Sequence, residues 1–199
     1  MNHTVEQAAQ VIIRCFQQGS KLLLCGNGGS SADCAHIAGE LCKGFLSKRR
    51  PEEHFVQAVG EEWAGHLQRG LPAIDLTAQS ALMTAIINDI SGEDVYAQQV
   101  MAYGQPGDVL LGLSTSGNAE NVRRAALVAK ARGLTVIGMT GHSGGKLKDI
   151  CDILLNAEAT ETYLVQEQHI QMYHRLCLMV EEAMFEEDGE KHAQPPTAD

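Results

Sequence analysis

Three short and almost uniformly apolar runs are the feature that most constrains the fold of this 199-residue chain. They are KLLLC at Lys21–Cys25, DVLLGL at Asp108–Leu113 and LTVIGM at Leu134–Met139. Apolar runs of this length without polar alternation are typical of strands that are buried on both faces. Such strands occur in parallel sheets covered by helices on both sides, so the runs favour an α/β fold.

The segments between these runs alternate as that fold requires. Two further strands are predicted at Pro72–Thr77 and Ile153–Asn156. Apolar spacing and turn signals predict helices at Val5–Gln18, Ala32–Leu46, Gln79–Asn88, Ala119–Arg132 and about Tyr163–Phe185, with a turn and a short helix at Gly144–Asp149. The alternation predicts a three-layer αβα sandwich with a central parallel sheet.

The length suits one domain with a sizeable core, which we place at residues 1–185. Residues 52–70 interrupt the alternation with a polar, acidic segment. Its apolar residues recur at near-helical spacing and are Phe55, Val56, Val59, Trp63 and Leu67. We interpret this segment as a small amphipathic helical insertion suited to packing on a partner subunit. The charged, Pro-containing residues 186–199 predict a disordered tail.

Charge and composition exclude several classes of function. A net charge of −10 argues against binding of nucleic acid or an anionic membrane, since phosphate groups favour clustered Lys and Arg. There is no basic-plus-apolar leader and no apolar run near the ~20 residues of a membrane span, so we expect a cytoplasmic protein. The six cysteines lie mostly in apolar runs and are expected to be buried thiols rather than disulfides.

Two loops rich in Gly and Ser follow predicted strands. STSGN at Ser114–Asn118 comes between a strand and a helix, and CGNGGSS at Cys25–Ser31 has the same position after the first strand. Hydroxyls at a helix N-terminus, where backbone amides point outward, can bind phosphate. The alternative is an ordinary capped helix start. Because neither loop matches a Walker or GxGxxG pattern, we expect a small phosphorylated molecule rather than a nucleotide.

Two predicted helices carry polar pairs at helical spacing. His36 and Glu40 are one turn apart, just beyond the first loop. On the last helix, Gln166 and His174 are about two turns apart and share a side. A structural role is the alternative for a histidine on a helix, and His169 is interpreted as a packing or surface residue.

Several motifs taken together resemble the phosphoheptose isomerase family of sugar isomerase (SIS) domain proteins. They are CGNGGSSADCAHIAGEL, LPAIDLT, TAIINDIS, GDVLLGLSTSGNAENV, GMTGHSGGKL and QEQHIQMYH, and the resemblance covers the chain from Lys21 to about Glu182. The resemblance implies a single SIS domain of flavodoxin-like fold. It also implies an isomerase that converts sedoheptulose 7-phosphate to an aldoheptose 7-phosphate through an enediol.

Carried over by position, the resemblance implies roles for particular residues. Glu40 and His174 would be the acid/base pair, and Ser114, Thr115 and Ser116 would hold the phosphate, although Ala119 stands where the family usually has Ser. Other substrate contacts would come from Asn27, Gly28, Gly29, Ser30, Asn88, Asp89 and Gln166. A zinc ion, seen in some members, would be held by His36, Glu40, Gln166 and His174.

Two choices stay open at this stage. The proton transfer could rely on the Glu/His pair alone, or a zinc ion could polarise the substrate carbonyl. The chain could also be a non-catalytic SIS protein that binds a phosphosugar or a protein partner such as a replication initiator, although that branch loses the acid/base residues present here. Apart from these choices, the resemblance implies a homotetramer in which the helices carrying His36 and His174 meet at a subunit boundary.

Overall fold

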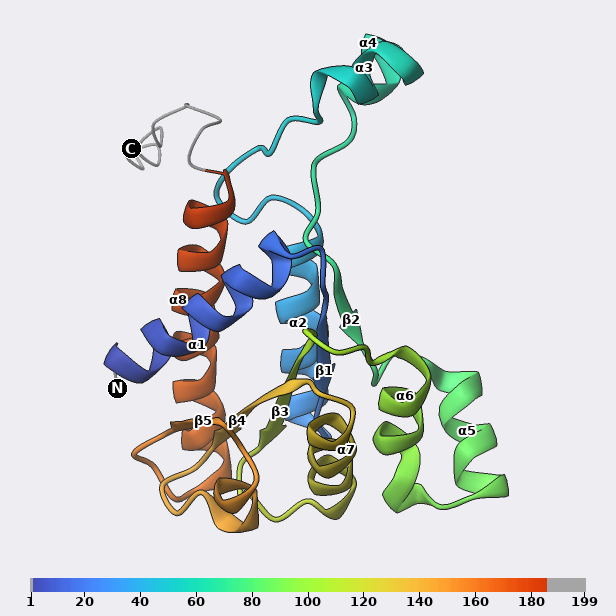
Figure 1. Cartoon of the computed structure of the whole chain (residues 1–199). Helices are drawn as coiled ribbons and strands as arrows, with labels where there is room; N and C mark the ends of the chain where they lie inside the picture. The colour runs from blue at the N-terminus through green and yellow to red at the C-terminus, as the bar shows by residue number, and fades with distance from the viewer. Residues whose placement is uncertain (1, 186–199) are drawn as a thin grey trace.

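A five-stranded parallel sheet forms the centre of the molecule, in the order β2-β1-β3-β4-β5 (Figure 1). The computed structural model describes residues 2–185, so the tail expected at 186–199 lies outside the described residues. The strands are β1 Leu22–Cys25, β2 Ala73–Asp75, β3 Val109–Ser114, β4 Thr135–Thr140 and β5 Ile153–Asn156. All five predicted strands are confirmed, with ends that differ by at most two residues.

Helices cover both faces of this sheet. One face packs against α1 Asn2–Gln17, α2 Gly29–Cys42 and α8 Thr162–Phe185, and the other packs against α5 Ser80–Asp89, α6 Val95–Tyr103 and α7 Glu120–Ala131. Successive side chains of β1 alternate between the two cores, because a strand has a two-residue repeat. Leu22 and Leu24 enter the first core, and Leu23 and Cys25 enter the second. This confirms the three-layer αβα architecture.

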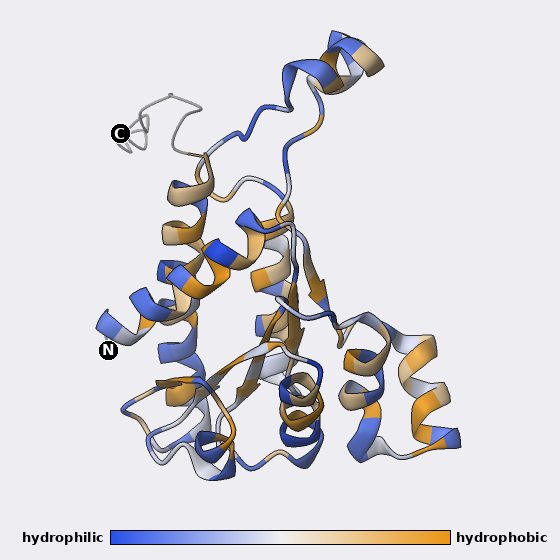
Figure 2. Cartoon of the chain, in the orientation of Figure 1, coloured by the Kyte–Doolittle hydropathy of each residue, from blue (hydrophilic) through white to orange (hydrophobic). Residues whose placement is uncertain are grey.

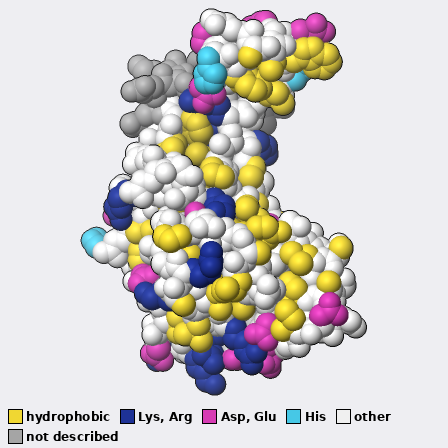
Figure 3. Space-filling model, turned by 45° about the vertical axis from the view of Figure 1, so that its right-hand side comes forward, with side chains coloured by type: hydrophobic (Ala, Val, Ile, Leu, Met, Phe, Trp, Pro, Cys, Tyr) yellow, Lys and Arg dark blue, Asp and Glu magenta, His cyan; other side chains and the backbone are white. Residues whose placement is uncertain are grey.

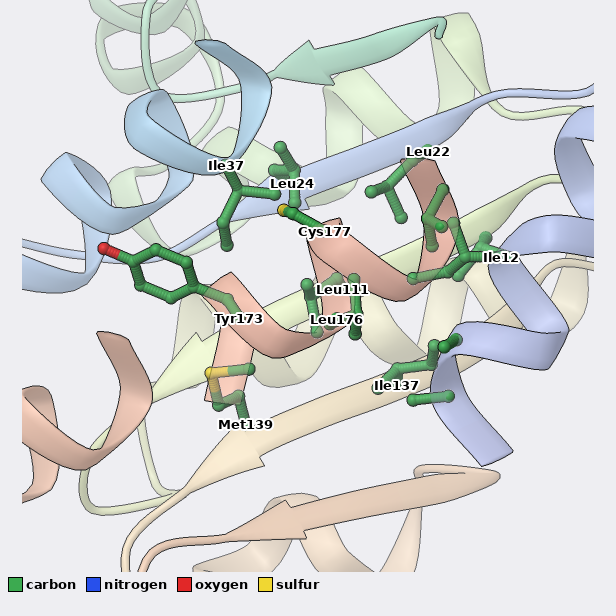
Figure 4. Packing of buried hydrophobic residues seen from close by; sticks show 14 of the residues in the cluster. Ile12, Leu22, Leu24, Ile37, Leu111, Ile137, Met139, Tyr173, Leu176 and Cys177 are labelled. Atoms are coloured by element: carbon green, nitrogen blue, oxygen red, sulfur yellow. The ribbon is translucent and has the colours of Figure 1, made fainter. Parts of the chain in front are cut away.

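The colouring by hydropathy shows how the sequence produces these layers. The strands are mostly apolar, with polar residues at their ends, whereas the outer helices carry both apolar and polar residues (Figure 2). Figure 4 shows the first core from close by, where Ile12 of α1, Ile37 of α2 and Leu176 of α8 gather around Leu24 and Leu111 of the sheet. The helix carrying the first polar pair and the last helix are therefore packed in one layer.

Two elements differ from the sequence prediction. The pattern missed the short 3-10 helix η1 Gly92–Asp94 and α6, because buried Gln99 occupies a core position and donates to the carbonyls of Leu76 and Val95. Helix α2 also ends at Cys42 rather than at Leu46. The amides of residues 45–47 bind the Glu181 carboxylate instead of continuing the helix.

The insertion at residues 52–70 forms two short helices, α3 Glu53–Val59 and α4 Glu61–Ala64. They project from the body of the molecule (Figures 1 and 3). Val56 and Ala64 are buried, but Trp63 is 67% exposed and Leu67 is 52% exposed. The segment predicted to be helical thus contains two short helices, and most of its apolar side chains have nothing to pack against in a single chain.

The remaining elements match the sequence closely. The predicted short helix after β4 is the 3-10 helix η2 Gly145–Asp149. The six cysteines are free; Cys42 is exposed and Cys151 half-buried, so the expected burial is wrong for these two. None of the helices within residues 2–185 has the length and apolar content needed to cross a bilayer.

Candidate active site

The two Gly/Ser loops open side by side at the end of the sheet. Strand order reverses between β1 and β3, which are neighbours in the sheet, and CGNGGSS and STSGN follow these two strands. In open α/β sheets, ligands bind beyond the carboxyl ends of the strands at such a reversal. The topology therefore places both predicted loops where a ligand site is expected.

Local hydrogen bonds give the STSGN loop its shape. The Gly117 amide donates to the Ser114 carbonyl at 2.9 Å, and the Asn118 amide donates to Ser116 Oγ at 3.2 Å. Gly117 has a φ of 65°, and a Cβ there would overlap the carbonyl of Gly144, so this position requires glycine. Ser116 is exposed and Thr115 is half-buried. Ser114 is buried, and its Oγ accepts from the Ala119 amide at 3.4 Å.

The loop after β1 is joined directly to the start of α7. Asn27 Nδ2 donates to Asn121 Oδ1 at 2.8 Å, and Asn121 Nδ2 donates back to Asn27 Oδ1 at 3.0 Å. The buried Tyr96 hydroxyl donates to the Gly26 carbonyl and lies 3.2 Å from Asn27 Oδ1. Gly28 has a φ of 57°, and Ser30 is buried beneath the turn. The Asn27 side chain predicted to contact substrate is thus held by Asn121 of α7 and Tyr96 of α6.

Helices α2 and α8 bring an imidazole pair and a carboxylate together. His36 Nε2 lies 3.1 Å from Glu40 Oε1, and Glu40 Oε2 accepts from Lys43 Nζ at 3.3 Å. The His174 ring crosses the His36 ring edge-on, with 5.0 Å between centroids, and packs beside Phe45 at 5.8 Å. We call His36, Glu40 and His174 the acid/base cluster, after the ionisable type of their side chains. It contains both members of the first polar pair picked out from the sequence and one member of the second.

Gln166 and the first turn of α2 are also in contact. Gln166 lies against Gly29 so closely that a Cβ at position 29 would overlap its amide. Both polar pairs therefore meet within one chain, and no second subunit is needed to join α2 to α8. Within the chain, α2 and α8 pack on the same face of the sheet, and the subunit boundary expected at these helices stays a prediction.

A buried ion pair fixes the far ends of α2 and α8 beside the cluster. Arg49 Nε donates to Glu181 Oε1 at 2.8 Å, and the same guanidinium donates to the carbonyls of Leu41 and Glu40 at 2.7 and 3.1 Å. Burial would raise the pKa of Glu181, but the backbone amides of residues 46 and 45 and the guanidinium outweigh it and lower that pKa. This network ties the base of the insertion to α8 and places Phe45 against His174.

Sequence reasoning missed two polar side chains next to His36. The buried Tyr173 hydroxyl lies 2.8 Å from His36 Nδ1 and donates to Asp33 Oδ1 at 3.4 Å. Burial raises the pKa of both Asp33 and Tyr173. The periodicity identifies Tyr173 only as part of the apolar stripe of α8, and nothing in it indicates where the hydroxyl goes. His169 is confirmed as a packing residue: it is buried, its Nε2 contacts the Thr140 carbonyl at 3.2 Å, and burial lowers its pKa.

Two predicted substrate contacts lie apart from the cluster. Asn88 and Asp89 end α5, where Asn88 Nδ2 donates to Asp89 Oδ1 at 2.7 Å. Helix α5 packs into the second core, on the opposite face of the sheet from α2 and α8. Two cavities, of about 140 and 480 Å³, lie away from both the cluster and α5, between α1 and the edge strand β5. The single chain therefore does not bring Asn88 and Asp89 to the acid/base cluster.

The expected zinc ligands suit the metal by type and only partly by position. Imidazole nitrogens, a carboxylate and an amide oxygen can bind zinc, and two ligands each about 2.0–2.2 Å from the ion are about 3.3 Å apart. The pair His36 Nε2 and Glu40 Oε1 has nearly that separation, at 3.1 Å. Within residues 2–185, however, no three His, Cys, Asp or Glu side chains are arranged to hold a metal ion.

Comparison with known proteins places this fold and its loops in a class. Residues 1–141 match the SIS domain family. The fold and the paired loops are thus those of a SIS-domain protein.

Individual relatives narrow the class. A phosphoheptose isomerase of Maridesulfovibrio salexigens is 44% identical over 172 residues, which is 86% of this chain and 75% of the relative. The solved phosphoheptose isomerase of Neisseria gonorrhoeae has a TM-score of 0.76 at 36% identity and covers 90% of this chain and 86% of its own. That of Francisella tularensis has a TM-score of 0.77 at 32% identity, with 90% and 85% coverage. The chain belongs to the phosphoheptose isomerase family.

Proposed function

We propose that this protein is an aldose–ketose isomerase that interconverts sedoheptulose 7-phosphate and an aldoheptose 7-phosphate. The observation that carries the proposal is the acid/base cluster, in which Glu40 of α2 and His174 of α8 both lie against His36 on one face of the sheet. The relatives that cover most of the chain are named phosphoheptose isomerases, which supports the same substrate class.

The loops would bind the two ends of the sugar phosphate. Thr115 and Ser116 at the mouth of STSGN, with the N-terminus of α7, are suited to the phosphate. Asn27, Gly28 and Gly29 on the neighbouring loop, with Gln166 beside them, are suited to the sugar hydroxyls. Ser114 and Ser30 are buried, so we assign them to the shape of the loops rather than to direct contacts.

The reaction moves a proton between adjacent carbons through an enediol. One of Glu40 and His174 removes the proton from the carbon beside the carbonyl while the other protonates the carbonyl oxygen. The enediol then collapses in the reverse sense: the hydroxyl on the neighbouring carbon loses its proton, and the first carbonyl carbon gains one. A carboxylate and an imidazole can both serve as acid or base near neutral pH.

The test is direct incubation of the purified protein with a panel of phosphosugars, followed by NMR of the sugar carbons. We expect conversion of sedoheptulose 7-phosphate to an aldose, with exchange of the transferred proton for deuterium in D₂O. Conversion of a different phosphosugar alone would reassign the substrate. Binding of the sugar phosphate without turnover would favour the non-catalytic alternative.

We propose zinc as the metal that His36, Glu40, Gln166 and His174 would hold. When bound there, zinc would act as a Lewis acid on the substrate carbonyl. Metal analysis of the protein as purified, and of His36→Gln as the matched variant, tests this assignment. We expect zinc to be retained by the parent and lost from the variant, and equal content in both would contradict the site.

We further propose a cytoplasmic homotetramer. The support is the set of large apolar side chains left exposed in one chain, among them Leu46, Trp63 and Ile90. Asn88 and Asp89 would then reach substrate bound to another copy. Sedimentation should give a tetramer, and cell fractionation should recover the protein with cytoplasmic markers; a fully active monomer would contradict the assembly.

A further inference from the structure

Tyr173 combines a fully buried ring with a hydroxyl directed out of the core. The ring lies among the apolar side chains of the first core, and Figure 4 shows the hydroxyl pointing away from them. The hydroxyl has two polar neighbours on α2: His36 Nδ1 at 2.8 Å and Asp33 Oδ1 at 3.4 Å. Phenylalanine would fill the same apolar space, so the hydroxyl itself needs an explanation.

The hydroxyl determines which edge of the His36 ring faces the site. An imidazole has two nitrogens, and the hydrogen bond made by one fixes the role of the other. With Nδ1 held by Tyr173, Nε2 is the nitrogen that lies 3.1 Å from Glu40 Oε1. His36 is exposed to solvent, so packing alone does not prevent a half-turn of its ring that would exchange nitrogen and carbon positions.

Asp33 holds the hydroxyl in turn. Asp33 is buried one turn before His36 on α2, and Tyr173 is on α8, so the three side chains link the two helices. We propose that Tyr173, anchored by Asp33, is a positioning residue that orients His36 so that Nε2 faces Glu40 in the acid/base cluster. Only the kinetic consequence of this inference rests on the proposed isomerase function. The orientation of the ring can be measured independently.

Nitrogen NMR of protein labelled with ¹⁵N-histidine and freed of metal by a chelator tests the orientation, because a metal ion on Nε2 would itself fix the tautomer. The His36 signals are assigned by their loss in His36→Gln. In the parent, at a pH where the ring is neutral, we expect two separate nitrogen signals of a single fixed tautomer. In Tyr173→Phe, we expect the two signals to move toward a common, exchange-averaged position. Tyr163→Phe is the matched control, because Tyr163 is exposed on the same helix, and it should leave the spectrum unchanged.

Kinetics test the consequence. Loss of a partner that orients a site histidine costs about 10- to 100-fold in activity where such histidines bind metals, and we expect a loss of that size in kcat with KM nearly unchanged for Tyr173→Phe. In the His36→Gln background, Tyr173→Phe should cause no further loss, because both changes act through one ring. Tyr163→Phe should keep the parental kcat.

The experiments distinguish a failure of the positioning role of Tyr173 from a failure of the proposed isomerase function. An averaged His36 signal in the parent, or an unchanged one in Tyr173→Phe, would overturn the positioning role even if the protein is an active isomerase. The parental spectrum needs no variant, so it decides the matter even if Tyr173→Phe does not fold. A fixed tautomer in a protein without isomerase activity would refute the proposed function and leave the orientation of His36 intact.

Discussion

The acid/base cluster and the STSGN loop are built in opposite ways. The loop takes its shape from hydrogen bonds between residues two to five apart, with the Gly117 backbone fitted against Gly144. The cluster joins His36 and Glu40 to His174, which lies more than 130 residues further along the chain. Its members meet only because α2 and α8 pack on one face of the sheet.

Under the proposed function, this difference separates phosphate binding by the loop from proton transfer by the cluster. A phosphate can be held by hydroxyls and amides that a single strand–turn–helix unit supplies, so the loop needs little from the rest of the fold. Proton transfer needs two titratable groups at a defined separation, which requires tertiary contacts to hold two helices in register. Changes to the long-range contacts should therefore disturb the cluster most, and changes within the loop should affect binding or local stability.

The largest expected effect is on the long-range contact that holds α2 to α8. Arg49→Met leaves Glu181 buried without its cationic partner, and removing one member of a buried pair typically costs about 3–5 kcal/mol of folding stability. Denaturant unfolding measures this loss of folding stability. Arg50→Met is the matched control, because Arg50 pairs with Glu61 in solvent, and we expect a change within about 0.5 kcal/mol. Equal effects at the two positions would mean that the buried network does not hold the helices.

The next effect is on turnover. Glu40→Gln and His174→Gln keep approximate shape but remove the carboxylate and the imidazole, and each should lower kcat by about 10²-fold or more. Affinity for the phosphosugar, measured by calorimetry, should change little because STSGN is untouched. Full turnover in both variants would show that the cluster is not catalytic.

A smaller effect is expected from a change in the STSGN loop, and it should lower the affinity for phosphosugar rather than kcat. Ser116→Ala removes an exposed hydroxyl at the mouth of STSGN and should weaken phosphosugar binding by about 1–3 kcal/mol, the size of a hydrogen bond to a charged group. Turnover at saturation should be nearly parental. Ser143→Ala is the control: its Oγ also accepts from a backbone amide two residues on, at 3.3 Å, but it lies outside the loop. If both variants lose the same affinity, the hydroxyl of Ser116 does not contact the phosphate.

The smallest expected effect is a gain in local stability. Ala119 is the N-cap of α7 and offers no side-chain acceptor to the first turn. Ala119→Ser should raise the free energy of unfolding by about 1 kcal/mol, since Ser is a preferred N-cap residue. Ala131→Ser, at the other end of the same helix, gains no cap and should not stabilise. A thermal melt that ranks the two variants equally would argue against the cap.

Most of the fold could be read from the sequence because its signals are local. Runs such as KLLLC need only neighbouring residues to be recognised as buried strands, and the turn residues after them mark the starts of helices. The prediction failed where a hydrogen-bond partner far along the chain changed the local structure. Helix α6 was missed because a polar residue, Gln99, occupies a core position, where it donates to the Leu76 carbonyl outside the helix as well as to the Val95 carbonyl within it. Helix α2 stopped early because Glu181 binds the backbone that would have continued it.

The candidate site also has features that the local sequence determines and features that depend on tertiary contacts. The sequence by itself determined the two Gly/Ser-rich loops and the spacing that puts His36 with Glu40, since a turn and a helical repeat depend on nearby residues alone. Tertiary structure decided that α2 and α8 join within one chain, that Ser114 and Ser30 are buried, and that Asn88 and Asp89 lie across the sheet. It also decided that the Tyr173 hydroxyl meets His36 at 2.8 Å. Periodicity reports which side of a helix is apolar, but the partner of a polar atom at the edge of that side depends on how two helices pack.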